Sequence, residues 1–200
     1  MGGNHQLLMS HGAAGGAVGS TITFSTSGTE ATAGWSLSEG NVRATNATGG
    51  LQSIRGDSFF TGAEKRVFVL EVITCGGNSY YGFNDPTEPI GTINERYWLR
   101  SKGGSHFLHD VTQWSSTSTG INNGDHLVFA VDAAARKAWF ALNSGTAWVN
   151  TGDPAAGTNE ALLFGNAWEF RILLQDLESS LDVRILSGAS YPYAIPSGFS

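Results

Sequence analysis

The residues with the clearest capacity to bind a metal lie in the segment HFLHD, from His106 to Asp110. A zinc site requires three or four ligands from Cys, His, Asp or Glu. On a strand, His106 and His109 would point to opposite faces, because successive side chains alternate. No cysteine and no third histidine lies near them in the sequence. The segment is therefore predicted to be a loop with solvated histidines, and neither a metal nor a cofactor is expected.

Paired carboxylates on one strand face would indicate glycoside hydrolysis, a chemistry found on related sandwich folds. A retaining enzyme needs two carboxyl groups about 5–5.5 Å apart, but the same-face neighbours of Glu71 are Val69 and Ile73. The other same-face pairs are predicted ion pairs, Glu169 with Arg171 and Asp182 with Arg184. No nucleophile elbow, phosphate loop or metalloprotease motif is present. No catalytic residue is assigned, and the chain is predicted not to be an enzyme.

Cys75 is the single cysteine, so no disulfide can form within the chain. It follows an apolar segment and precedes two glycines, and a buried or half-buried thiol is expected. A nucleophilic cysteine needs a neighbouring histidine and an electropositive setting, of which the local sequence has no sign. The lone thiol is consistent with assembly in a reducing cytoplasm.

The charge composition argues against nucleic acid as a partner. The 200 residues include 17 acidic and 11 basic side chains, a formal net charge of −6. Binding to phosphates requires clustered Lys and Arg, but only Lys65-Arg66 and Arg136-Lys137 are adjacent. The first 19 residues lack the basic and continuous apolar regions of a signal peptide or a membrane span. Neither nucleic acid nor a membrane is expected as a partner.

Short strands are the elements that must position these residues. Leu127, Phe129 and Val131 alternate with other residues, and so do Phe140 and Leu142 after a short polar link. This period of two predicts an antiparallel hairpin with one strongly apolar face, on which Phe129 lies opposite Phe140. Further strands are predicted at 21–25, 34–38, 41–45, 51–55, 65–74, 79–84, 97–101, 161–164, 168–175 and 181–186. Many short strands with Gly-rich turns indicate an all-β, two-sheet antiparallel β-sandwich in a single domain.

The order of motifs around the hairpin resembles the centre of SPRY (B30.2-like) domains. It consists of a Gly-Asp pair, an apolar strand ending in Asp, a turn, a Trp-Phe strand ending in Asn, and a later Trp. KRVFVLEVI at 65–73 and SYYGFN at 79–84 are similar to the preceding SPRY strands. The resemblance implies a SPRY, concanavalin A-like jelly roll over residues 20–200. It also implies structural roles for the motif residues Asp125, Asp132, Trp139, Phe140, Asn143 and Trp148.

Two more segments are similar to a subset of SPRY domains in virion proteins of tailed bacteriophages. They are WVNTGDPAAG at 148–157 and the ending YPYAIPSGF at 191–199. The Asn-Phe-Gly that commonly precedes this ending is replaced by RILSG at 184–188, which leaves the pairing of the last strand open. The resemblance implies a location in the virion, after assembly in the host cytoplasm.

Residues 1–19 differ in composition from the rest of the chain. An apolar cluster, Leu7-Leu8-Met9, precedes a linker rich in Gly and Ala, a composition that is flexible unless it is bound. The segment is predicted to dock the protein onto another virion protein or a further copy in a homo-oligomer. The alternative is that it lies over its own sandwich.

Aromatic residues between positions 75 and 120 are the candidates for ligand binding. In SPRY domains, loops at one end of the sandwich form the recognition surface, and the corresponding candidates are Tyr80, Tyr97 and Trp114. Tyr and Trp combine apolar area with a polar group, which suits contacts with sugars or proteins. Tyr81 and Trp98 lie within predicted strands and are expected in the core instead.

The predicted function is a non-enzymatic structural or adhesion component of a tailed-phage virion, as a capsid decoration protein or a tail or fibre protein. The N-terminal segment would dock it, and the sandwich loops would face outward. One alternative is a carbohydrate-binding module that recognises a host-surface glycan. The other is a SPRY adaptor that binds peptides.

Overall fold

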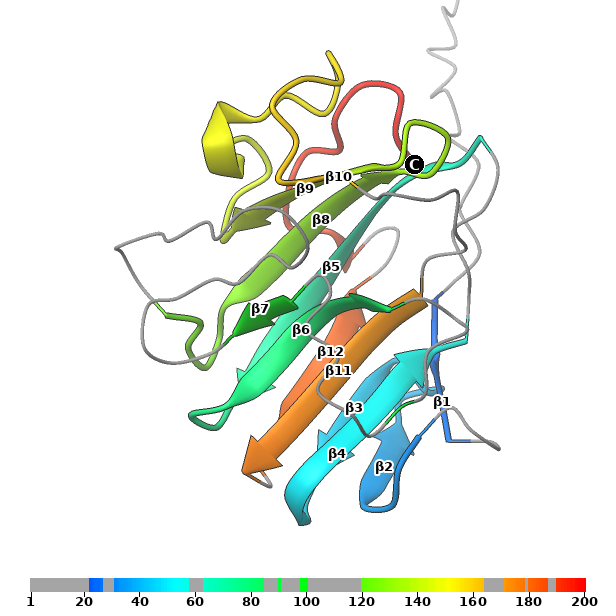
Figure 1. Cartoon of the computed structure of the whole chain (residues 1–200), viewed down its shortest axis with the longest axis vertical. Helices are drawn as coiled ribbons and strands as arrows, with labels where there is room; N and C mark the ends of the chain where they lie inside the picture. The colour runs from blue at the N-terminus through cyan, green and yellow to red at the C-terminus, as the bar shows by residue number, and fades with distance from the viewer. Residues whose placement is uncertain are drawn as a thin grey trace, which may run out of the picture.

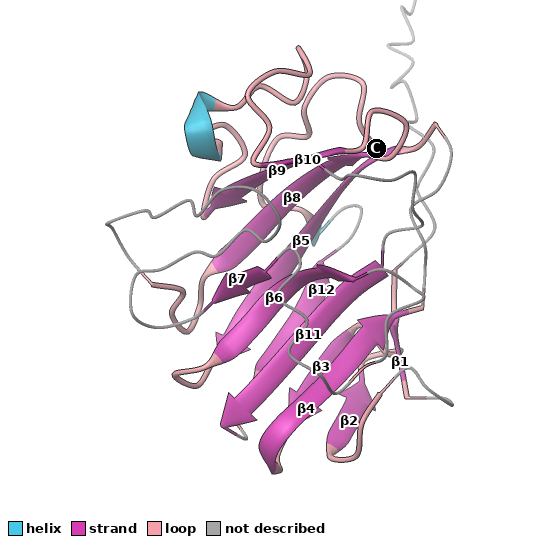
Figure 2. Cartoon of the chain, in the orientation of Figure 1, coloured by secondary structure: helices cyan, strands magenta, loops and turns pink. Residues whose placement is uncertain are grey.

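The computed structural model describes residues 22–26, 31–57, 63–84, 90, 98–100, 120–163, 171–178, 180–186 and 190–200. Two antiparallel sheets pack face to face, and strands and loops make up almost all of the described chain (Figures 1 and 2). The 3-10 turn η1 spans Val149–Thr151. Within the described residues, no helix is long and apolar enough to cross a membrane. The predicted all-β antiparallel sandwich is confirmed.

The strands pair in an order that differs from their order in the chain. The smaller sheet runs β1 (Phe24–Ser25), β4 (Gly49–Gly56), β11 (Arg171–Glu178), β6 (Ser79–Asn84), β7 (Trp98–Arg100). The larger sheet runs β10 (Leu162–Leu163), β9 (Lys137–Leu142), β8 (His126–Asp132), β5 (Lys65–Thr74), β12 (Asp182–Leu186), β3 (Arg43–Asn46), β2 (Trp35–Ser38). The last strand, whose pairing the sequence left open, lies between β5 and β3. The pair β1 and β4 therefore lies at one edge of its sheet, and the pair β2 and β3 lies at one edge of the other.

Apolar side chains from both sheets meet in the core. Phe129 lies opposite Phe140 in the register of β8 and β9, as predicted. Its ring stacks on Phe68 with centroids 4.9 Å apart and meets the edge of Phe83, from the other sheet, at 5.5 Å. Tyr81 is fully buried, which confirms that it is a core residue. The alternation read from the sequence thus places the inward faces of the central strands correctly.

The opposite face of the β8–β9 hairpin is buried as well, so the predicted single apolar face is wrong. Val128 and Trp139 are each 1% exposed on this outer face. It is covered by residues 190–200, which we call the C-terminal strap, drawn in red in Figure 1. The strap lies far from the hairpin in the sequence, since Phe199 follows Trp139 by 60 positions. For that reason the alternation within the hairpin did not reveal that its outer face is buried.

Backbone and side-chain hydrogen bonds fasten the C-terminal strap to β5. Ser200 N–H donates to Lys65 O at 3.1 Å, and Val67 N–H donates to Ser200 O at 2.9 Å. The Tyr191 hydroxyl donates to Val67 O. Burial raises the pKa of Tyr191 to about 12, so this hydroxyl keeps its proton at ordinary pH. β12 pairs with β5 from Val69 to Thr74. The strap pairs with the first residues of β5, Lys65 and Val67, which β12 does not reach.

A network of ion pairs covers the outer surface of β3, β12 and β5. Asp182 pairs with Arg43 at 2.6 Å, and Arg184 pairs with Glu39 at 3.0 Å and with Glu71 at 3.3 Å. The predicted pair between Asp182 and Arg184 is therefore wrong. Asp182 pairs with Arg43, its diagonal neighbour on β3, and Arg184 pairs with Glu71, which lies directly opposite it on β5. The other predicted pair includes residue 169, which is outside the described residues.

Candidate binding pocket at the open edge of the sandwich

Of the three aromatic ligand-binding candidates, only Tyr80 lies in the described part of the chain. Tyr80 lies within β6, half-buried, opposite Arg100 of β7. Tyr97 and Trp114 are outside the described residues, as are the cluster Leu7-Leu8-Met9 and the segment 106–110. The loop surface and the N-terminal docking segment therefore stay predictions. Among the residues that the structure does describe, no three His, Cys, Asp or Glu side chains are placed to hold a metal ion.

The motif residues at the ends of the hairpin make contacts within the fold. The Asp125 carboxylate accepts hydrogen bonds from Asn122 N–H and from the Asn143 amide, both at 2.7 Å. Asn143 has a positive φ of 53° and accepts a hydrogen bond from His126 N–H at 2.7 Å. These bonds close the end of the hairpin at which β8 begins.

Asp132 fastens the other end of the hairpin. Its carboxylate lies 2.8 Å from Lys65 Nζ and accepts a hydrogen bond from Ala135 N–H at 2.8 Å. Burial by itself would raise the pKa of Asp132. The hydrogen bond from Lys65 and those from Ala135 and Ala134 N–H outweigh burial and hold the pKa below its usual value of 3.8. Asp132 is therefore an ionised anchor for the turn.

The three remaining motif residues belong to the two apolar clusters. Phe140 faces the core between the sheets, whereas Trp139 and Trp148 lie in the outer cluster under the C-terminal strap. The Trp139 indole N–H donates to Thr158 O at 2.9 Å. Trp148 forms an isolated antiparallel bridge with Ala141. All three residues contact other parts of the fold.

Cys75 is half-buried, as expected from the sequence. Its Sγ lies 3.5 Å from Ile121 O and 3.5 Å from Asn123 Oδ1. Burial raises the pKa of the Cys75 thiol, which keeps it protonated and weakly nucleophilic at neutral pH.

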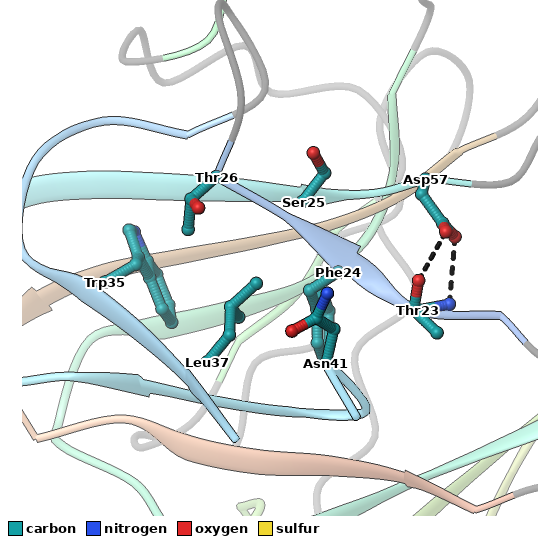
Figure 3. Close-up of a pocket in the computed structure, with 8 residues that line it drawn as sticks. All are labelled: Thr23, Phe24, Ser25, Thr26, Trp35, Leu37, Asn41 and Asp57. Atoms are coloured by element: carbon teal, nitrogen blue, oxygen red, sulfur yellow. Dashed lines mark hydrogen bonds between the residues drawn. The ribbon is translucent and has the colours of Figure 1, made fainter. Parts of the chain in front are cut away.

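A pocket of about 480 Å³ opens at the edge of the sandwich where β1 approaches β2 and the turn that follows it (Figure 3). Its polar lining consists of Thr23, Ser25, Thr26, Asn41 and Asp57, and its apolar lining consists of Phe24, Trp35 and Leu37. Phe24 N–H donates to Asn41 O at 2.8 Å and joins the two sheets beside the pocket. The volume is within the usual range of small-molecule sites.

Several hydrogen-bonding groups of the pocket have no partner among the described residues. Trp35 is 9% exposed, and its buried indole N–H lacks an acceptor. The side chains of Asn41 and Thr26 are exposed and make no hydrogen bond within the described part of the chain. Asp57, in contrast, accepts hydrogen bonds from both Thr23 N–H, at 2.9 Å, and the Thr23 hydroxyl (Figure 3).

The lining of this pocket offers hydrogen-bonding and apolar groups and one carboxylate. Asp57 is the one ionisable side chain that lines the pocket. General acid–base chemistry on a glycoside needs a second carboxyl group across the scissile bond. No such partner faces Asp57 within the pocket lining. The pocket can therefore hold a ligand through hydrogen bonds and apolar contact.

Sequence reasoning missed this pocket because its residues come from separate segments. Thr23 and Asp57 are 34 positions apart, and the turn at Asn41 lies between them in the chain. Trp35 has the pattern of an ordinary strand aromatic, WSLS, in which the larger side chains alternate with serines. The absence of charge in that strand is unusual for an edge strand, but the sequence does not show that the strand lies at an edge.

No family model matches the chain, and no curated protein matches it. Solved structures do match it. The SPRY domain of human HERC1 is 16% identical, with a TM-score of 0.62 over 81% of this chain and 97% of that one. A human SPRY domain is 10% identical, with a TM-score of 0.54 over 79% and 98%. The TRIM65 PSpry domain is 11% identical, with a TM-score of 0.56 over 84% and 92%. The chain thus has the β-sandwich fold of SPRY domains.

Proposed function

We propose that this protein is a non-enzymatic binding component of a tailed-phage virion. The observation that carries the proposal is the packing of the two segments that resemble phage virion proteins. Trp148, at the start of the first segment, lies in the outer apolar cluster of β8 and β9. Tyr191, Tyr193 and Phe199, from the second segment, pack against the same cluster. Two motifs far apart in the sequence therefore form one structural unit, which supports a common origin for both.

Close contacts within this unit depend on small residues. A Cβ atom on Gly152 would lie 2.7 Å from Trp139 Cδ1, and a Cβ atom on Gly145 would lie 2.8 Å from Tyr193 Cβ. Phe199 meets Trp139 edge to face with ring centroids 6.1 Å apart. Both segments thus pack closely around the β8–β9 hairpin, Gly152 and Phe199 against Trp139 and Tyr193 beside Gly145, which favours their recurrence as a pair in one class of protein.

A binding role is supported by the fold and by the pocket. The structural neighbours are SPRY domains, which generally serve as non-catalytic interaction modules. The pocket has unpartnered hydrogen-bonding groups but no pair of acid and base residues. Fold alone does not establish function, so the proposal rests on these groups together with the phage-like segments.

In the proposed particle, Leu7, Leu8 and Met9 dock the protein onto another virion protein or a further copy of itself. The sandwich faces outward, either as a capsid decoration or as part of a tail or fibre. Tyr80, Tyr97 and Trp114 belong to the outward surface in this arrangement. The protein reaches this position by assembly in the host cytoplasm.

Purified particles test the proposal directly. Phage particles induced from the host that carries the coding sequence are separated on a density gradient and labelled with antibodies against residues 22–200. Electron microscopy is expected to show label at a repeated position on the capsid or the tail. A particle preparation made with the gene deleted is the control for nonspecific labelling. Intact particles without the protein, in a host that expresses it, would show the proposal to be wrong.

A further inference from the structure

We infer that the pocket between β1 and β2 binds a neutral saccharide, with Trp35 and Asn41 as its main hydrogen-bonding residues. This inference rests on the proposed binding function and assigns it a site and a ligand class. The site lies at the open edge of the sandwich and includes none of the loop aromatics predicted from the sequence.

The buried indole N–H of Trp35 is the first reason. A tryptophan N–H that is removed from water normally has a hydrogen-bond acceptor, as Trp139 has in Thr158 O. Trp35 is 9% exposed and its N–H has none among the described residues. Figure 3 shows the ring nitrogen at the end of the ring nearer Thr26, whose own hydroxyl is unpartnered. An acceptor on a ligand in the pocket would give this donor its missing partner.

The side chain of Asn41 is the second reason. Asn41 has a positive φ of 68° and is held by the bond from Phe24 N–H to its carbonyl oxygen. The backbone is therefore set, while the exposed amide group has no partner in the described structure. An amide offers both donors and an acceptor, which matches the hydroxyl groups of a sugar ring.

The charge of the pocket and the residues that line it indicate the class of ligand. Asp57 is the one charged residue of the pocket, and no Lys or Arg lines it, so an anionic ligand would be repelled. A metal ion is not favoured, because it needs more oxygen ligands than one carboxylate that is already bonded to Thr23. The mixture of hydroxyl and amide groups with the apolar side chains of Trp35 and Leu37 suits a neutral pyranose, which has polar edges and apolar faces.

An extended peptide is the other neutral ligand with many hydrogen-bonding groups. Peptides that lengthen a sheet use free backbone groups of an edge strand. Beside this pocket, the Phe24 N–H of β1 is already bonded to Asn41 O. The Trp35 indole and the Asn41 amide instead offer side-chain groups to a ligand, and a saccharide is recognised mainly by side chains.

The test uses the full chain, labelled with ¹⁵N, and a panel of neutral methyl glycosides at millimolar concentration. The chain has six tryptophans, and Trp35→Phe assigns the Trp35 indole N–H signal. At least one glycoside is expected to shift this signal and to bind with an affinity measurable by titration.

Trp35→Phe removes the N–H but keeps a ring, and Asn41→Gly removes the amide but tolerates the positive φ. Each variant is expected to bind about tenfold more weakly, the value of one hydrogen bond.

Trp148→Phe is the matched control, because Trp148 is also 9% exposed but lies in the outer cluster. It is expected to bind the glycoside as the unmodified chain does, and melting curves of all variants verify that they are folded. The inference is overturned if no glycoside binds, if binding survives both pocket variants, or if Trp114→Ala alone abolishes it. It is also overturned if short neutral peptides, and no glycosides, shift the Trp35 signal.

Failure here and failure of the virion proposal are distinguishable. A protein that is present in particles but has no saccharide affinity contradicts only the pocket inference. A protein that binds the glycoside through Trp35 but is absent from particles contradicts only the virion location.

Discussion

Single residues of the core set much of the stability of the sandwich, and Phe140 is the clearest case. It is 3% exposed, and its ring centroid lies 5.4 Å from that of Phe129. Truncation of a buried Phe to Ala typically costs about 3–5 kcal/mol, and a domain of this size loses about 2–4 °C per kcal/mol. Phe140→Ala is therefore expected to lower Tm by about 10 °C or to give insoluble protein. Thermal melting followed by circular dichroism measures the change.

Ile195→Ala is the control for this variant, because Ile195 is 42% exposed. It removes an apolar side chain from the surface and is expected to leave Tm nearly unchanged. A shift of only a degree or two for Phe140→Ala would contradict its place in the core.

Asp132 gives a residue-level prediction for acid conditions. Its pKa in the folded protein is held below the usual value of 3.8. A carboxyl group with a lowered folded-state pKa contributes stability above its unfolded pKa, and this contribution is lost as pH falls through the folded-state pKa. Asp132→Asn is expected to be less stable than the unmodified protein near pH 6, and the difference is expected to narrow as pH falls from about 5 to about 2. Urea unfolding over this pH series measures it, and a constant difference would contradict the assignment.

At the scale of elements, the C-terminal strap completes the larger sheet on its outer side. It contributes Ser200 to the backbone pairing of β5, and Phe199 to a contact with Trp139 and with the ammonium group of Lys65, 5.6 Å from the ring centroid. The strap keeps Val128 and Trp139 out of water, and full burial of a large apolar side chain is worth about 1.5–3 kcal/mol. Deletion of residues 190–200 is therefore expected to lower the free energy of unfolding by about 3 kcal/mol or more. The uncovered face is expected to bind the dye ANS, and chemical unfolding measures the loss.

Ser200→Ala is the matched control for the strap deletion. It keeps both backbone bonds to β5 and loses only the 3.3 Å contact from the Ser200 hydroxyl to Lys65 O. Its stability and dye binding are expected to equal those of the unmodified chain. If the deletion behaved like this control, the strap would not be part of the folded unit.

A buried carboxylate at the end of β11 links elements of both sheets. Asp176 is fully buried and accepts hydrogen bonds from Asn46 of β3 at 3.0 Å and from Ser79 of β6 at 3.1 Å. It also accepts from Ser180 and Leu181 N–H in the turn before β12, at 3.0 and 3.1 Å. One side chain thus holds the turn between the last two strands and ties the smaller sheet to the larger.

For the whole molecule, the proposed assembly predicts a separation between folding and docking. The described sandwich makes its core from residues 22–200, so deletion of residues 1–19 is expected to leave Tm nearly unchanged. The truncated protein is expected to be absent from particles or oligomers, because it lacks Leu7, Leu8 and Met9. Incorporation into particles, with Leu7→Ala as a milder variant, measures the effect. Normal incorporation of the truncated protein would contradict N-terminal docking.

Much of the fold could be predicted because strand alternation is a local property. β5 and β6 have the predicted bounds, and Phe129 faces Phe140 as expected. In each case the signal is the contrast between apolar and other residues within one short segment. For the binding site, the sequence predicted Tyr80, Tyr97 and Trp114 from residue type alone. Whether such residues lie close together depends on the conformation of the loops, which strand alternation does not determine.

The sequence by itself determined the strands, the sandwich class and the resemblance to SPRY domains, since each depends on residues close together in the chain. The tertiary structure decided which strands form edges, that the C-terminal strap covers the outer face, and that Asp182 pairs with Arg43, 139 positions away. It also brought Trp35, Asn41 and Asp57 to one pocket. These features depend on the order in which distant strands pair, and that order is set by how both sheets together bury their apolar faces.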